Sequence, residues 1–263
     1  MIASKRLIVG NWKMNLTVNE ASLFAHRLND MIELRRDVEV VIAPTALCLQ
    51  PLSLQVDHRK IKLAAQNLYW RDNGAFTGEI SANQLRGIVS YAIIGHSERR
   101  HIFGETDKEI RNKVQAAVRN RIKPILCIGE TAAERAAGET HGILHDQITA
   151  GLSNITSDEV DSVAIAYEPV WAIGTGDSAL PRDIQTAAKA IRSQVKHLFG
   201  EAASQKIRIL YGGSVNIDNA SDYLNTPGVD GLLIGGASLR TKEFSTIINK
   251  AHVDSVRGET NKG

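Results

Sequence analysis

Residues 162–168 read SVAIAYE, an almost continuous apolar run that ends in a single carboxylate, Glu168. Seven other short runs share this character and are rich in Ile, Val and Leu. They are residues 6–12 (RLIVGNW), 38–44 (VEVVIAP), 61–67 (IKLAAQN), 91–95 (YAIIG), 123–129 (KPILCIG), 207–213 (IRILYGG) and 231–236 (GLLIGG). Runs without a polar alternation are typical of strands buried on both faces.

The segments between these runs have the periodicity of amphipathic helices. Residues 178–199 and 106–120 carry apolar side chains at steps of three and four. Strands that alternate with helices indicate a parallel sheet. Eight such units in about 250 residues match a single-domain α/β fold, the closed (β/α)8 TIM barrel. An open doubly wound sheet is the alternative.

Composition excludes several classes of function. The chain has 263 residues, a net charge of +2 and no dense run of Lys and Arg, so neither nucleic acid nor an anionic membrane is an expected partner. No apolar run approaches the roughly 20 residues of a membrane span. No linker divides the chain. We therefore expect one barrel domain over residues 1–251 and a polar, flexible tail over residues 252–263.

Cysteine and histidine patterns predict no metal site. Cys48 and Cys127 are too far apart for a metal-binding motif and too few for a disulfide framework, so a reducing cytoplasm is the expected location. His141 and His145 have helical ligand spacing, but no glutamate follows the first histidine. No Walker loop, dinucleotide fingerprint or nucleophile elbow is present.

Polar residues and glycines follow the C-terminal ends of the predicted strands. These are Asn11, Lys13, Gln66, Asn67, His96, Ser97, Glu98, Cys127, Glu130, Glu168, Gly212, Gly213, Ser214, Gly235 and Gly236. Because active sites of such barrels lie at this end, we expect these residues to converge at one mouth.

Local context suggests roles for some of them. His96 is the only one of the eight histidines at a predicted strand end, and Ser97 is the expected N-cap of a short helix. Glu98 is expected to pair with the adjacent Arg99 or Arg100. Glycine turns after strands seven and eight indicate a phosphate site, because backbone N–H groups of these loops commonly bind phosphate.

Nine motifs together resemble those of the triosephosphate isomerase family. They are GNWKMN (10–15), AAQN (64–67), GAFTGEIS (74–81), IIGHSERR (93–100), FGETD (103–107), CIGE (127–130), YEPVWAIGTG (167–176), YGGSV (211–215) and GGASL (235–239). The resemblance covers residues 7 to about 250 in the family's order. It implies that dihydroxyacetone phosphate and D-glyceraldehyde 3-phosphate are interconverted through a cis-enediolate, without a metal or an organic cofactor.

The resemblance also assigns residues to roles in that reaction. Glu168 matches the general base, His96 the neutral electrophile, and Lys13 the cation that stabilises oxyanion charge. Asn11 matches a substrate-binding amide, and Gly174, Ser214, Gly235 and Gly236 match positions that bind the phosphate. Glu98 matches a carboxylate near the lysine, while Cys127 and Glu130 match supporting positions.

A lid over residues 169–179 is implied by the same resemblance. Pro169 favours an extended Glu168 at the strand end. The lid departs from the family at Asp177 and Ser178, where a lysine and a threonine are common. These two residues have the character of a helix N-cap, so we expect altered opening at this hinge.

The loop over residues 68–81 implies a homodimer. It carries Tyr69, Trp70 and Phe76, an apolar content that is unfavourable on an exposed surface. By resemblance this loop docks into a second subunit and brings Thr77 near Asn11 and Lys13 of the partner subunit.

Three other functions compete with this interpretation. An isomerase of a four-carbon ketose phosphate could use the same scaffold. An aldolase could use Lys13 as a Schiff base. A phosphosugar-binding protein would need no catalytic pair, and the presence of both Glu168 and His96 argues against it.

Overall fold

Eight parallel strands form a closed barrel in which each strand pairs with the next and β1 pairs with β8. The computed structural model describes residues 5–173 and 178–260, and for residues 253–260 it describes the backbone alone. The strands are β1 (Arg6–Asn11), β2 (Val38–Ala43), β3 (Ile61–Ala65), β4 (Tyr91–Ile94), β5 (Lys123–Ile128), β6 (Ala164–Tyr167), β7 (Arg208–Tyr211) and β8 (Gly231–Ile234). The predicted single-domain (β/α)8 barrel is confirmed.

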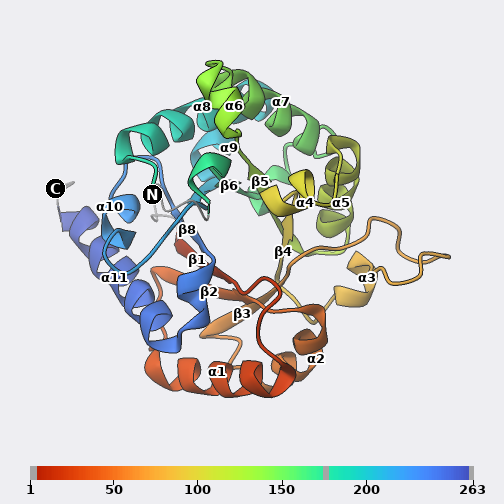
Figure 1. Ribbon diagram of the computed structural model, residues 1–263, viewed down its shortest axis with the longest axis vertical. Coiled ribbons are helices and arrows are strands. Elements are labelled where there is room, and N and C mark those ends of the chain that lie inside the picture. The colour runs from red at the N-terminus through yellow and green to blue at the C-terminus, as the bar shows by residue number, and fades with distance from the viewer. Residues whose placement is uncertain (1–4, 174–177, 261–263) are drawn as a thin grey trace.

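Helices surround the barrel in chain order (Figure 1). The α-helices are α1 (Val18–Met31), α2 (Ala46–Gln55), α3 (Ala82–Leu85), α4 (Ser97–His101), α5 (Asp107–Arg119), α6 (Ala132–Ala136), α7 (Thr140–Leu152), α8 (Pro181–Phe199), α9 (Glu201–Lys206), α10 (Ala220–Leu224) and α11 (Thr241–Thr260). Short 3-10 turns are η1 (Val160–Ser162), η2 (Val170–Ala172) and η3 (Gly236–Leu239).

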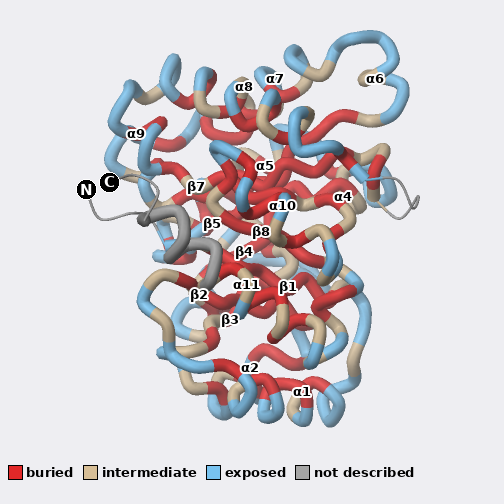
Figure 2. The backbone as a smooth tube through the Cα atoms, turned by 90° about the vertical axis from the view of Figure 1, so that its left-hand side faces the viewer, coloured by how far each residue is buried: buried red, intermediate tan, exposed pale blue. Residues whose placement is uncertain are grey.

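The strands are buried on both faces, which explains their lack of polar alternation. Inward residues such as Val9, Ile93 and Leu210 form one apolar cluster inside the barrel. Outward residues such as Ile8 and Ile94 pack in a second cluster under the helices. Figure 2 shows the buried strands at the centre and the exposed outer turns of the helices. Two-sided burial of this kind requires continuous apolar runs.

Helix boundaries correct one of the sequence-based expectations. Helix α8 begins at Pro181 after Leu180, so Ser178 is not its N-cap, and Asp177 lies outside the described residues. Proline suits the first helical position because its missing N–H would have no partner there. Helix α11 continues to Thr260, so residues 252–260 of the expected tail have a helical backbone, and the domain boundary at residue 251 stays a prediction. Within the described part of the chain, no helix has the length and apolarity to cross a membrane.

Candidate active site

Glu168 lies directly after β6 and is 1 % exposed. Its Oε2 accepts a hydrogen bond of 2.8 Å from the backbone N–H of Ser97. Its Oε1 lies 3.2 Å from Nε2 of His96, yet it has no hydrogen-bond partner among the described residues. A Cβ built on Gly212 would lie 2.9 Å from Cγ of Glu168, so a glycine leaves room for this carboxylate. The site therefore contains a buried carboxylate with one oxygen that accepts no hydrogen bond from the described residues.

His96, not Ser97, is the N-cap of α4. Its Nδ1 accepts a 3.2 Å hydrogen bond from the backbone N–H of Glu98. A ring nitrogen that accepts carries no proton, so the imidazole is neutral and its proton is on Nε2. That nitrogen faces Glu168. The capping bond thus fixes both the tautomer and the direction of the remaining N–H.

Lys13 has a backbone φ of 52°, in the left-handed region that non-glycine residues rarely adopt. Two side chains hold this conformation. Asn11 Oδ1 accepts from the Lys13 N–H at 3.1 Å, and Gln66 Nε2 donates to the Lys13 carbonyl and to that of Ala43, each at 2.8 Å. A strained backbone that its neighbours hold in place is common at functional sites.

The Lys13 ammonium donates to Glu98 Oε1 at 2.6 Å. Glu98, in α4, therefore pairs with a lysine in the loop after β1, and the expectation that it pairs with Arg99 or Arg100 is wrong. Those arginines bind Glu105 and Asp107 instead.

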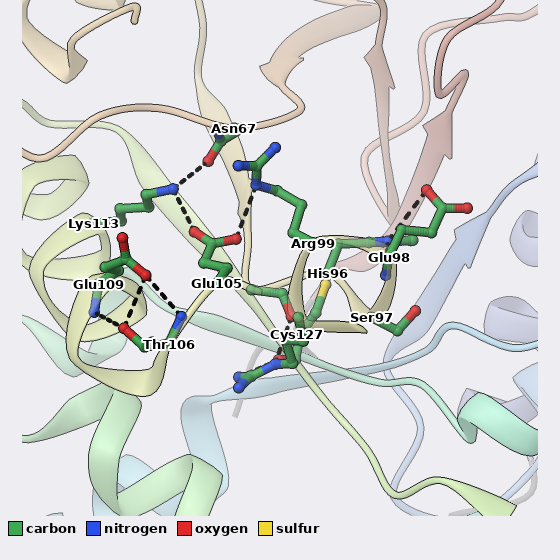
Figure 3. A network of polar contacts seen from close by, with 12 residues as sticks. Asn67, His96, Ser97, Glu98, Arg99, Glu105, Thr106, Glu109, Lys113 and Cys127 are labelled. Atoms are coloured by element: carbon green, nitrogen blue, oxygen red, sulfur yellow. Dashed lines mark hydrogen bonds and ion pairs between the residues drawn. The ribbon is translucent and has the colours of Figure 1, made fainter. Parts of the chain in front are cut away.

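The outer side of α4 is tied to α5 and to the end of β3. Glu105 accepts from Arg99 Nε at 2.9 Å and forms a close ion pair with Lys113. Lys113 in turn donates to Asn67 Oδ1 at 2.9 Å (Figure 3). Glu105 and Lys113 are both buried, so each offsets the charge that the other brings into the protein interior.

Glu130 anchors the segment that follows Glu168. Its side chain is fully buried and accepts from the Tyr167 hydroxyl at 3.1 Å and from Trp171 Nε1 at 2.9 Å. Its backbone carbonyl accepts from the N–H of Val170 at 3.0 Å. Burial, and then the charge of Glu130, raise the pKa of Tyr167, so this phenol remains a donor. The first two residues of η2 are thereby held by Glu130, which follows β5.

Cys127 is buried at the end of β5. Burial, followed by the nearby charge of Glu168, raises the pKa of its thiol well above the usual value. The thiol is therefore protonated and is a poor nucleophile. Its position beneath Glu168 fits a supporting role.

The glycine turns after β7 and β8 lie at the same mouth. Ser214 Oγ donates to the Ala172 carbonyl at 2.7 Å, which connects the β7 loop to η2. A Cβ built on Gly235 would lie 3.5 Å from Cε of Lys13, whereas one on Gly236, at the start of η3, would meet open space. Gly174 lies outside the described residues.

Thr77 lies apart from this group within a single chain. It is exposed in the segment between β3 and α3, which extends away from the barrel (Figure 1). The other expected site residues that the structure describes gather at the C-terminal mouth. In the described ranges, no group of three or more His, Cys, Asp or Glu side chains could hold a metal ion.

Sequence reasoning missed the roles of Gln66 and Gly212 in holding Lys13 and Glu168. Both residues lie at the ends of predicted strands, and this position could have indicated that they belong to the site. It also missed the contacts of Arg100 with two backbone carbonyl groups, because such contacts leave no pattern in the sequence.

Comparison with known proteins agrees with this geometry. The family model described as triosephosphate isomerase matches residues 6–251. The chain is 44 % identical to the triosephosphate isomerase of Alkaliphilus metalliredigens over 93 % of this chain and 99 % of that protein. It is 45 % identical to that of Chloroherpeton thalassium over 94 % and 99 %, and 42 % identical to that of Clostridium perfringens over 92 % and 98 %. A match over almost the whole of both chains shows that this protein belongs to the triosephosphate isomerase family.

Proposed function

We propose that this enzyme interconverts dihydroxyacetone phosphate and D-glyceraldehyde 3-phosphate by proton transfer through a cis-enediolate. The observation that carries the proposal is the buried carboxylate of Glu168 with a free oxygen 3.2 Å from the protonated nitrogen of a neutral imidazole. Abstraction of a proton beside a carbonyl needs a base and a donor for the oxyanion that develops. Glu168 and His96 supply this combination.

Glu168 acts as the base and His96 Nε2–H as the electrophile at the substrate oxygens. Lys13 adds positive charge to the same region and, with the Asn11 amide, binds the substrate. In the state described, Oε2 of Glu168 is held by the Ser97 N–H, so the carboxylate leaves this bond when it meets the substrate. The reaction moves protons alone, so no metal or organic cofactor enters the proposed mechanism.

The phosphate is assigned to the glycine turns after β7 and β8, with Ser214, Gly235 and Gly236, and to Gly174 on the lid. An enediolate phosphate expels its phosphate when water or rotation intervenes, so a closing segment over residues 169–179 has a chemical purpose. The anchoring of η2 to Glu130 and Ser214 supports a lid that moves from a fixed base.

The ion pair between Lys13 and Glu98 favours this function over an aldolase. A paired ammonium is a cation and not the free amine that forms a Schiff base. Borohydride reduction in the presence of substrate should leave Lys13 unmodified, as mass spectrometry of the digested protein would show.

Turnover of glyceraldehyde 3-phosphate tests the proposal. The wild type should be active. Glu168→Asp should lose about 100-fold or more in kcat, because a displacement of about 1 Å can have such an effect. His96→Gln should also lose activity, since its amide replaces the polarised ring N–H imperfectly. An inactive wild type, or full activity of Glu168→Asp, would refute the proposed function.

We also propose a cytoplasmic homodimer. A cleft of about 450 Å³ beside Asn11 and Lys13 is bordered by exposed apolar side chains, among them Met14 at 92 % and Phe103 at 69 % exposure. Exposed apolar groups around a cleft favour a protein partner. The protruding loop of a second copy, with Thr77 near its tip, is the proposed occupant. Sedimentation should show a dimer for the wild type, and a larger fraction of monomer for Thr77→Arg at the same protein concentration.

A further inference from the structure

Strands β4 and β5 separate at the point where the candidate site begins. Their ladder ends at the pair Ile94 and Leu126. One residue further, the guanidinium of Arg100 donates from Nε to the Gly95 carbonyl at 2.8 Å and from Nη2 to the Cys127 carbonyl at 3.1 Å. The arginine thus continues the connection between the two strands after their own hydrogen bonds stop.

The chain around Gly95 is shaped to admit this side chain. Gly95 has a φ of 71°, and a Cβ there would lie 3.1 Å from Nη2 of Arg100 and 3.0 Å from Ile110. A larger residue would strain the backbone and crowd the guanidinium. The next residue is His96, which caps the helix that carries Arg100. Arg100 therefore binds back to the residue that precedes His96, and His96 caps the helix that carries Arg100.

The second strand that Arg100 holds supports Glu168. The backbone N–H of Glu168 donates to the Ile128 carbonyl at 2.8 Å, one residue beyond Cys127. A Cβ on Gly129, the residue after β5, would lie 1.8 Å from the carbonyl oxygen of Glu168, so the segment that ends β5 and Glu168 are in direct contact. One guanidinium hence connects the segment that bears His96 to the segment against which Glu168 rests.

We infer that Arg100 is a positioning residue that sets the separation of His96 and Glu168 by bridging the Gly95 and Cys127 carbonyls. Its side chain is about one-tenth exposed. Among the described residues, Arg99 lines the cleft beside Lys13, whereas Arg100 does not. Arg100 therefore acts through the backbone and does not touch the substrate. The inference rests on the proposed function of His96 and Glu168.

The planar fork is the feature that the inference depends on. Two donors on one rigid group can hold two carbonyls at a fixed spacing, whereas a lysine ammonium is a single point. Asp107 Oδ1 balances the charge from the opposite side at 2.7 Å, and that carboxylate is about half exposed. The Asp107 contact can therefore be removed separately from the two carbonyl contacts.

Three single variants separate these contributions. Arg100→Met should lower kcat by about 10- to 100-fold and leave KM within about threefold, since misplaced catalytic groups affect the transition state more than the bound substrate. Arg100→Lys, which keeps the charge, should remain at least about fivefold below the wild type. The control Asp107→Asn, which keeps the fork on both carbonyls, should stay within about twofold of it.

A double-mutant cycle with His96→Gln distinguishes positioning from general structural support. If Arg100 acts through His96, Arg100→Lys should add less than about a twofold loss of kcat in that background. Additive losses, or a folded Arg100→Lys enzyme with wild-type kcat, would overturn the inference. The proposed function would survive either result, because it depends on the wild type, Glu168→Asp and His96→Gln alone.

Discussion

The two ends of the barrel contain similar polar residues, but these are paired with one another at the N-terminal end, whereas one carboxylate oxygen at the C-terminal end has no hydrogen-bond partner among the described residues. At the N-terminal end, Glu39, Lys62, Tyr91 and Arg208 point inward from β2, β3, β4 and β7 and bind one another. At the C-terminal end, Glu168 has an oxygen that accepts no hydrogen bond from any described residue. Both ends belong to the same strands, so the difference lies in the side chains.

The network at the N-terminal end is closed. Arg208 donates to Glu39 Oε2 at 2.7 Å and to the Tyr91 hydroxyl at 2.7 Å, and that hydroxyl donates to the same carboxylate at 2.8 Å. Lys62 forms a close ion pair with Oε1 of Glu39. Burial alone would raise the pKa of Glu39, but the hydrogen bonds from Lys62 and Arg208 outweigh it and lower the pKa to about 2.

The C-terminal end shows the cost of a working site. Lys13 keeps a left-handed backbone, and Glu168 keeps a buried oxygen without a donor. Such features each cost on the order of 1–3 kcal/mol and persist where function requires them. We therefore expect the fully paired network around Glu39 to stabilise the fold, and the incompletely paired Glu168 to serve the proposed chemistry.

Of the substitutions that test this contrast between the two ends, Lys13→Met should have the largest effect on activity. It removes the cation proposed to stabilise oxyanion charge, so kcat/KM should fall by about 100- to 1000-fold. The thermal midpoint should change little, because the pair with Glu98 is about one-third exposed on both sides. Steady-state kinetics and calorimetry test these two expectations. A loss of stability without a loss of activity would contradict the proposed role of Lys13 in the reaction.

Glu39→Gln should destabilise the fold and leave the chemistry intact. The pKa of Glu39 falls from 4.5 to about 2 in the folded state, which corresponds to about 3 kcal/mol at roughly 1.4 kcal/mol per unit. Because the folded pKa is the lower one, this stabilisation is complete above about pH 4.5 and is lost as the pH falls toward 2.

Unfolding midpoints in urea at a fixed protein concentration, measured from pH 7 to pH 3, test this dependence. The gap between wild type and Glu39→Gln should narrow below about pH 4.5. The substituted enzyme should keep a wild-type kcat at pH 7. A gap that does not depend on pH would show that the carboxylate charge is not the source of the stabilisation.

Lys62→Met is the matched counterpart of Lys13→Met at the other end. Arg208 and Tyr91 still bind Glu39 after this change, and the Lys62 side chain is about one-third exposed. The loss of stability should therefore be about 1 kcal/mol, with kcat unchanged. Reduced turnover in a stable Lys62→Met enzyme would contradict the division between the two ends.

The barrel itself follows from the sequence because its decisive signal is local. Each strand is rich in apolar residues, with charged residues only near its N-terminal end, and each predicted run contains the observed strand, as for β6 within residues 162–168. Beyond the N-terminal ends of the strands, the inner and outer faces are both apolar, so the pattern cannot show which side chains point inward. That assignment comes from the closed register of the strands.

Pairings between distant residues could not be read in the same way. Glu98 has two arginines beside it in sequence, but its partner is Lys13, 85 residues away. Arg208 binds Glu39 across 169 residues. Ser97 has the residue type of an N-cap, yet the chain turns at Gly95 so that His96 takes that position. Charge and capping preferences are local, whereas these contacts depend on how the barrel closes.

The smallest expected effects come from one hydroxyl at each end. Tyr91→Phe removes a bridge between Arg208 and Glu39, which remain bound to each other, so stability should fall by about 0.5–1.5 kcal/mol and kcat should not change. Tyr167→Phe removes a donor to Glu130, whose carboxylate also holds Trp171 at the base of the proposed lid. Here kcat should fall by a few fold.

The two tyrosines undergo the same chemical change, so each serves as the control for the other. Burial raises the pKa of both phenols, which keeps both hydroxyl groups protonated across the working pH range. Parallel measurements of kcat and thermal midpoint should therefore separate the variants by location alone. If Tyr91→Phe lowers kcat as much as Tyr167→Phe does, the polar network at the N-terminal end also influences turnover, and the contrast between the ends fails.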